Sequence, residues 1–218
     1  KRSIEDSLQR LGLSSIDIVF VHDLSPDNGD LGERWTEQFE VAAKGAFPAL
    51  TKMREEGIIR GWGLGVNRPQ PILKALEVAD PNIMLVAIQY TLFEHEDALK
   101  NLFPAMETKH VKAVIGGPLN GGFGAGMDRW NYGPGLPKEM VEKRERIKLV
   151  ADRYNVSLST VALQFAAQHP VVAAVIPGAS RPEQVVENVR SFHTSVPSEL
   201  WETLKNENLI HPDCPVGT

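Results

Sequence analysis

A histidine at the end of an apolar, β-branched run is the first candidate for chemistry: His22 directly follows residues 16–21, Ile-Asp-Ile-Val-Phe-Val. In α/β proteins the working side chains stand at the carboxyl ends of parallel strands. A neutral imidazole at such a position can hydrogen-bond the oxygen of a carbonyl group and orient it. The alternative is a histidine that caps the strand or bonds a loop carbonyl, and spacing alone leaves both interpretations open.

The other histidines occur singly, without the spacing that metal ligands show along a helix or loop. The sequence therefore predicts no metal site. These histidines are His95, His110, His169, His193 and His211.

A glycine-rich segment at residues 116–135 is the second candidate, because it follows the apolar run 111–116. It contains neither a P-loop pattern nor a properly spaced G-x-G-x-x-G pattern. Glycines still allow backbone N–H groups to approach phosphate oxygens closely, so a pyrophosphate-binding loop is one interpretation. A flexible surface loop is the other.

Composition limits what these residues can belong to. A chain of 218 residues with 42% hydrophobic residues is long enough for one sizeable core, and we expect a single domain over residues 1–218. The net charge of −5 and the lack of a Lys/Arg cluster predict neither nucleic-acid nor membrane partners. The single cysteine, Cys214, forms no internal disulfide, which favours a reducing compartment. With no spanning or signal-peptide pattern, we expect a cytoplasmic protein, either monomeric or homo-oligomeric.

The elements that must position the candidates alternate between apolar β-rich runs and amphipathic stretches, which predicts an α/β fold with a parallel sheet. The glycines of the second strand, on one face, suggest that a backbone or ligand approaches closely there. Capping-box patterns at Ser3 and Ser180 predict two helix starts, and Gly12 and Gly57 predict helix ends. The predicted strands are 16–22, 58–66, 83–90, 111–116 and 171–176. The predicted helices are 4–11, 39–53, 70–78, 96–106, one that opens at residues 180–183, and 198–206.

Five strand–helix units make either an open sheet or part of a barrel. The sequence then shows a resemblance to the aldo-keto reductase superfamily. Residues 3–12 with 16–22 resemble the family's third helix and fourth strand, residues 55–65 its fifth strand, and residues 175–179 with Glu187 and Asn188 its C-terminal cofactor signature. Within the superfamily, the resemblance is to the branch of aldose and pyridoxal dehydrogenases.

The resemblance implies a (β/α)8 TIM barrel of aldo-keto reductase type, of which strands 4 to 8 are represented here. It also implies a catalytic aspartate, tyrosine, lysine and histidine, of which only the histidine is present, as His22. We therefore expect the native protein to be longer by roughly 80 to 120 residues, from the usual barrel length.

The resemblance further assigns residues to a nicotinamide cofactor. Gln89 matches a carboxamide-binding glutamine, and Asn67 lies one residue beyond the position of an equivalent asparagine; for Gln89 the alternative is a hydrogen bond to nearby backbone. Glu187 and Asn188 match adenine-binding positions, with a solvated helix face as the alternative. The expected cofactor-binding residues are Asn67, Gln89, Gly116, Gly117, Pro118, Leu119, Asn120, Gly122, Phe123, Pro177, Gly178, Ala179, Ser180, Gln184, Glu187 and Asn188.

Three departures from the family pattern bear on this assignment. Gly116 and Gly117 stand where many members have a nicotinamide-stacking aromatic residue and a serine. Gly178 and Gln184 stand where NADP-preferring members have cations for the 2′-phosphate, so we predict NAD as the cofactor, with NADP as the alternative that Arg181 would support. Trp130 and Tyr132 are candidates for lining the substrate pocket, with packing under a long loop as the alternative.

The predicted function is an NAD(P)-dependent oxidoreductase that transfers hydride between the cofactor and a small carbonyl, alcohol or sugar lactol. The first alternative is a general NADPH-dependent aldehyde and ketone reductase. The second is a non-catalytic, cofactor-binding regulatory subunit.

Overall fold

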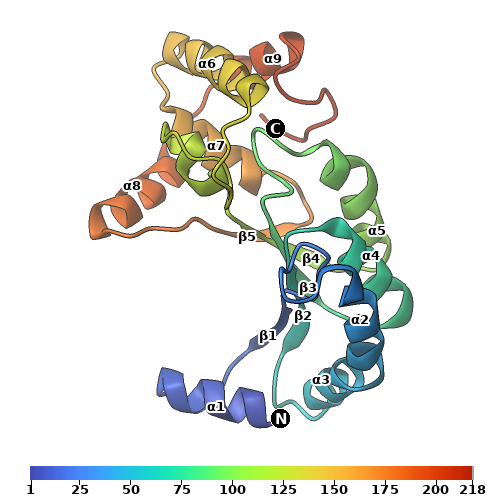
Figure 1. Ribbon diagram of the computed structural model, residues 1–218. Coiled ribbons are helices and arrows are strands. Elements are labelled where there is room, and N and C mark those ends of the chain that lie inside the picture. Colours follow the sequence, from blue (N-terminus) through green and yellow to red (C-terminus); the bar gives the residue numbers. More distant parts are fainter. Residues whose placement is uncertain (218) are drawn as a thin grey trace. The chain divides into compact units, whose positions relative to one another are not determined.

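The computed structural model describes residues 1–217, which fall into two compact units (Figure 1). Unit 1 comprises residues 1–86 and 105–112, and unit 2 comprises residues 87–104 together with the chain from residue 113 onward. A single domain over residues 1–218 stays a prediction.

Unit 1 contains three parallel strands and the helices between them. In chain order these are α1 (Arg2–Leu11), β1 (Ile18–His22), a short turn η1 (Gly32–Arg34), α2 (Trp35–Lys44), α3 (Ala46–Glu55), β2 (Gly61–Val66), α4 (Pro69–Val78) and β3 (Ile83–Ala87), whose last residue is in unit 2. β1 pairs with β2 from Ile18↔Gly61 to His22↔Gly65, and β2 pairs with β3 at Gly65↔Leu85. Because all three strands run parallel, their carboxyl ends lie at one edge.

Aromatic side chains join the helices of unit 1 to its central strand. The Phe47 ring stacks on Trp62 at 5.2 Å between centroids and meets Phe39 edge-on at 5.4 Å. All three side chains are buried, and α2, α3 and α4 lie together beside the strands in Figure 1. The predicted helix 39–53 is wrong in one respect, since Gly45 (φ −125°, ψ −74°) leaves helical geometry and divides it into α2 and α3.

The glycines of β2 confirm the expected close approach at one position. A Cβ atom on Gly63 would overlap the backbone carbonyl oxygen of Ile83 on the neighbouring strand. At Gly61 and Gly65 the nearest atoms to such a Cβ are side-chain carbons at 3.4 and 3.6 Å. The approach at Gly63 is therefore made by backbone, and the other two glycines have room for a methyl group.

Unit 2 contains two parallel strands and a larger set of helices. In chain order these are a π-turn η2 (Ala98–Leu102), α5 (Phe103–Thr108), which runs on into unit 1, β4 (Lys112–Gly116), η3 (Asn120–Ala125), α6 (Lys138–Arg153), α7 (Leu158–Ala167), β5 (Val172–Ile176), α8 (Pro182–His193) and α9 (Ser198–Asn206). β4 pairs with β5 from Ala113↔Val172 to Gly116↔Ile176. The sequence patterns assigned no helix to α6 or α7, although α7 is the most buried helix of the unit.

The five predicted strands are all present, and their ends differ from the prediction by up to three residues. The run 83–90 ends as a strand at Ala87 because Ile88 turns into the left-handed region, with φ 55°. β2 is buried throughout, whereas β5 is largely exposed and Ile176 is 48% accessible.

Both predicted capping boxes need correction. α1 begins at Arg2, one residue before Ser3, and its N-cap Lys1 provides no side-chain acceptor. In α8 the N-cap is Arg181, which has no acceptor atom, and the side-chain oxygen of Gln184 receives the backbone N–H of Arg181 at 3.2 Å. Gly12 does end α1, with φ 67°, because only a residue without Cβ adopts this conformation easily. Between residues 1 and 217, no helix is long and apolar enough to cross a membrane.

Candidate functional site

His22 is the last residue of β1, and its imidazole is open to solvent. Its side chain is 82% exposed, and Nε2 lies 3.8 Å from the Asp23 carboxylate. Across residues 1–217 the ring makes no hydrogen bond, so the structure gives no support to a strand-capping role. A hollow of about 380 Å³, lined by residues that include Val21, Leu31 and Val41, adjoins it. The imidazole is thus available to a ligand that enters at this end of β1.

The loop after β1 is fixed to the end of β2. Asp23 adopts φ 52° and donates its N–H to the Gly65 carbonyl at 2.9 Å. Asn67 lies one residue beyond β2 and donates its amide to Asp27 Oδ2 at 3.2 Å. His22 and Asn67 therefore share the carboxyl edge of the strands in unit 1. The amide of Asn67 already has a protein partner, and its assignment to the cofactor stays a prediction.

Gln89 lies in unit 2, just past the left-handed residue Ile88. The backbone N–H of Ile88 donates to the Gly116 carbonyl at 2.9 Å, which brings Gln89 to the carboxyl end of β4. The Gln89 side chain is half-buried, and in the described chain its amide has no hydrogen-bond partner. An amide in this position is able to receive the hydrogen bonds of another amide.

The glycine-rich segment is a compact turn with its own internal contacts. Gly117, Asn120, Gly121 and Gly122 all have positive φ, and Asn120 and Phe123 are buried. A Cβ on Gly121 would overlap the backbone oxygen of Asn131. This packing indicates an ordered turn rather than a flexible surface loop, and its binding of pyrophosphate stays a prediction.

A pair of asparagines fastens this turn to the chain that follows. Asn120 Nδ2 donates to Asn131 Oδ1 at 2.9 Å, and Asn131 N donates to the Asn120 carbonyl at 3.0 Å. Asn131 Nδ2 donates in turn to Glu94 Oε2 at 3.2 Å. Sequence reasoning missed Glu94 and Asn131, since a hydrogen bond across 37 residues leaves no local pattern.

We expect Asn131→Ala to loosen the turn, because it removes two side-chain hydrogen bonds, each contributing about 1 kcal/mol. Amide hydrogen exchange over residues 117–136 should accelerate, while that of α7 should stay unchanged. Glu94→Gln, which keeps a neutral acceptor, should have a smaller effect. Unaltered exchange in Asn131→Ala would show that the pair does not hold the turn.

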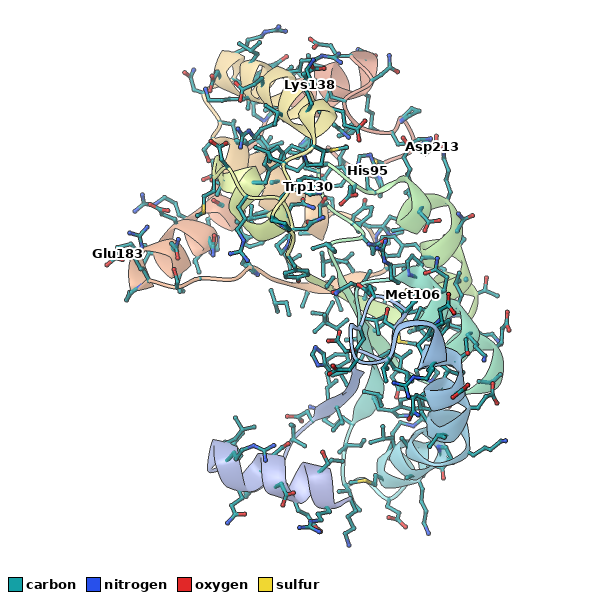
Figure 2. All side chains as sticks on the ribbon, viewed as in Figure 1. His95, Met106, Trp130, Lys138, Glu183 and Asp213 are labelled. Atoms are coloured by element: carbon teal, nitrogen blue, oxygen red, sulfur yellow. The ribbon has the colours of Figure 1, made fainter. Side chains whose placement is uncertain are left out.

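Trp130 and Tyr132 have different environments. The Trp130 ring meets Phe123 at 5.0 Å and Phe93 at 6.2 Å, both edge-on, and Arg144 lies 4.3 Å above the Phe123 ring. Trp130, labelled in Figure 2, is half-buried, and these contacts support the packing interpretation. Its assignment to the substrate pocket stays a prediction. Tyr132 is 62% exposed.

The chain after β5 places the remaining candidates on or before α8. Gly178, Ala179 and Ser180 are exposed, and Gln184 Oε1 accepts the backbone N–H of Ser180 at 2.7 Å. Glu187 is exposed and Asn188 half-buried on α8. The capping bonds use the oxygen of Gln184 and leave its amide nitrogen for a ligand.

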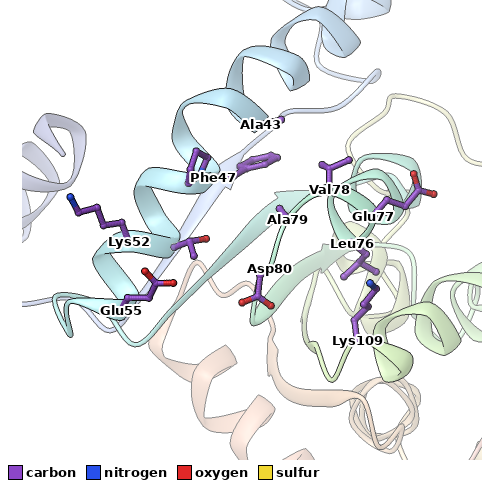
Figure 3. Close-up of a pocket in the computed structure, with 12 residues that line it drawn as sticks. Ala43, Phe47, Lys52, Glu55, Leu76, Glu77, Val78, Ala79, Asp80 and Lys109 are labelled. Atoms are coloured by element: carbon purple, nitrogen blue, oxygen red, sulfur yellow. The ribbon is translucent and has the colours of Figure 1, made fainter.

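A second hollow in unit 1 is at the opposite end of the strands from His22. It has a volume of about 610 Å³ and is lined by α3, the end of α4 and Lys109 (Figure 3). Asp80, in this hollow, precedes the amino end of β3. Among residues 1–217, no group of three His, Cys, Asp or Glu side chains is placed to hold a metal ion.

Comparison with known proteins identifies the family. Residues 1–208 match the model of the Aldo/keto reductase family, and the chain belongs to this family. It is 37% identical over 215 residues to a pyridoxal 4-dehydrogenase of Microbacterium luteolum, covering 96% of this chain and 61% of that protein. It is 33% identical over 215 residues to a D-threo-aldose 1-dehydrogenase of a Pseudomonas species, with 96% and 62% covered. The chain spans about three fifths of the length of these relatives.

Solved structures agree with the family. The aldo-keto reductase AKR11C1 from Bacillus halodurans, in its holo form, superposes with a TM-score of 0.71 at 24% identity, covering 94% of this chain and 63% of that one. This likeness confirms the α/β fold class and the expected part of an aldo-keto reductase barrel. The resemblance drawn from the sequence motifs is likewise confirmed.

Proposed function

We propose that this chain belongs to an oxidoreductase that transfers hydride between a nicotinamide cofactor and a small carbonyl, alcohol or sugar lactol. The observation that carries the proposal is the end of β4, where a fixed glycine turn and the unpaired amide of Gln89 stand together in unit 2. Such an arrangement fits a phosphate-bearing ligand with an amide group. The dehydrogenase names of both relatives support the reaction class.

Each candidate residue then has a stated role. When bound, the nicotinamide supplies or accepts the hydride. Gln89 would hold the carboxamide through its side-chain amide, and the turn at Gly117–Phe123 would hold the pyrophosphate. The assignment of Asn67, in unit 1, to the cofactor stays a separate prediction. The adenylate half would lie beside α8, held by residues 177–180, Gln184, Glu187 and Asn188. His22 would donate a hydrogen bond to the substrate oxygen and so stabilise the negative charge that develops there.

We further propose a preference for NAD. A 2′-phosphate requires cationic partners, and Gly178 and Gln184 offer none, while Arg181 is exposed at the N-cap of α8. We expect NADH to bind at least about tenfold more tightly than NADPH, since one charge-assisted contact contributes about 1.5–3 kcal/mol. Fluorescence titration of the full-length protein with both cofactors measures this, and Arg181→Ala should weaken NADPH alone. Equal or tighter NADPH binding would contradict the preference.

The two alternative functions are separated by simple assays. A general NADPH-dependent carbonyl reductase would oxidise NADPH in the presence of varied aldehydes. A non-catalytic regulatory subunit would bind the cofactor without any aldehyde-dependent change in absorbance. If neither cofactor binds, the proposed function itself is wrong.

A further inference from the structure

Two glycines stand at the carboxyl end of β4 in unit 2, Gly116 as its last residue and Gly117 directly after it, so the backbone there carries no side chains. Gly116 is buried, and Gly117 has φ 59°. A Cβ on Gly117 would lie 2.8 Å from Ile88 Cγ2 and 3.5 Å from the Tyr132 hydroxyl oxygen. No side chain fits at Gly117 without displacing Ile88. The space above this glycine is therefore bounded by Ile88 on one side and by the phenol of Tyr132 on another.

Tyr132 is held from its backbone, and its ring is left free. The preceding residue, Asn131, has φ 47° and is fixed through both its backbone and its side chain to Asn120 and Glu94. Tyr132 itself is 62% exposed, and within residues 1–217 its ring joins no aromatic pair and its hydroxyl makes no hydrogen bond. Trp130, two residues earlier, packs against Phe93 and Phe123. In the anchored segment, the Trp130 ring is half-buried against other aromatic rings, and the Tyr132 ring is exposed.

We propose that the Tyr132 ring packs against the nicotinamide ring of the bound cofactor, in place of the side chain that β4 lacks. This inference rests on the proposed function. An exposed aromatic ring beside a glycine floor offers a flat apolar surface, and offset stacking is favourable for two planar rings. The oxidised nicotinamide carries a positive charge, to which the electron-rich face of a phenol is attracted. Tyr132 should therefore favour NAD⁺ over NADH.

The test uses calorimetric titration of the full-length protein with NAD⁺, NADH and ADP-ribose, which lacks the nicotinamide. We expect Tyr132→Ala to weaken NAD⁺ binding by roughly 3- to 10-fold, the effect of one stacked or cation–π pair, and to weaken NADH binding less. ADP-ribose binding should not change. Tyr132→Phe, which keeps the ring, should retain NAD⁺ affinity within about twofold. Leu136→Ala, a truncation in the same loop, is the matched control and should bind all three ligands normally.

Two results would overturn the inference. One is unchanged NAD⁺ affinity in Tyr132→Ala. The other is an equal loss for ADP-ribose and NAD⁺, which would mean that Tyr132 shapes the loop and makes no contact with the nicotinamide. If the unmodified protein binds none of the three ligands, the proposed function fails and the inference fails with it. Binding of NAD⁺ by the unmodified protein with no effect of Tyr132→Ala rejects the inference alone.

Discussion

Replacing Gly63 by alanine should destabilise the protein by at least about 3 kcal/mol, in the range of severe core substitutions. The added methyl group would overlap the carbonyl oxygen of Ile83, which is backbone and does not rotate away. Gly63 is buried in β2, so relief requires the two strands to separate. Urea unfolding followed by circular dichroism measures the change in the free energy of unfolding.

Gly65→Ala is the matched control, because it adds the same methyl group to the same strand and the same face. Its nearest neighbour would be the Phe20 Cβ at 3.6 Å, an ordinary contact. We expect a change within about 1 kcal/mol, as for a tolerated substitution. Similar losses in both variants would indicate that any side chain on this face disrupts β2, and would contradict the role of the Ile83 carbonyl.

Acidification from pH 6.5 to pH 4 should remove about 3 kcal/mol of stability through His95, at about 1.4 kcal/mol per pKa unit. Burial, and secondarily the charge of Lys143, lowers the pKa of His95 from its ordinary 6.5 to about 4, while the Thr91 carbonyl and Glu96 act in the opposite direction. The unfolded chain therefore takes up this proton before the folded chain does. Stability is present above pH 6.5 and is lost as the pH falls toward 4.

The geometry around His95 explains why the neutral ring is preferred. Nε2 accepts the backbone N–H of His211 at 3.1 Å, and Nδ1 lies 3.0 Å from the Thr91 carbonyl, to which it donates. In this tautomer His95 holds the segment after α9, residues 207–217, in place within unit 2 through the His211 N–H. Protonation of Nε2 would remove the acceptor of the His211 N–H and set two N–H donors against each other. The free energy of unfolding measured at several pH values tests this.

His95→Leu should be less stable at pH 7, because the His211 N–H loses its partner, and its stability should depend less on pH between 4 and 6.5. His110→Asn, at an exposed position with φ 55° that asparagine tolerates, should keep the pH dependence of the unmodified protein. If His95→Leu shows the same pH dependence as the unmodified protein, another group is responsible for the acid sensitivity.

Much of the fold was predictable from local sequence. The strand ending at His22 and the glycine that ends α1 are encoded by side-chain periodicity and backbone freedom over a few residues. The same holds for the alternating glycines of β2 and for the family motifs. These signals depend on residues that are close in the sequence, so they can be recognised without knowledge of the tertiary structure. The existence and order of all five strands were predicted in this way.

Other features arise from contacts between residues distant in sequence. Ser3 matched a capping pattern, but the helix begins one residue earlier, at Arg2. The pattern at Ser180 did precede a helix, where Gln184 supplies the acceptor. The helix predicted over 39–53 divides at Gly45, where α2 and α3 pack around Phe39 and Phe47. Local propensity is a weak preference, and packing decides between starts and ends of nearly equal energy.

The sequence alone identified His22, Gln89 and the glycine-rich segment as candidates for cofactor and carbonyl chemistry. Only the tertiary structure distinguished Trp130, which is half-buried and meets Phe93 and Phe123 edge-on, from Tyr132, which is exposed beside Gly117. It did so through the Glu94–Asn131–Asn120 hydrogen bonds, which connect segments far apart in the chain. Both aromatic residues have the same local sequence character. Their difference arises from which ring finds neighbours once the chain is folded, and neighbours of this kind are set by tertiary packing.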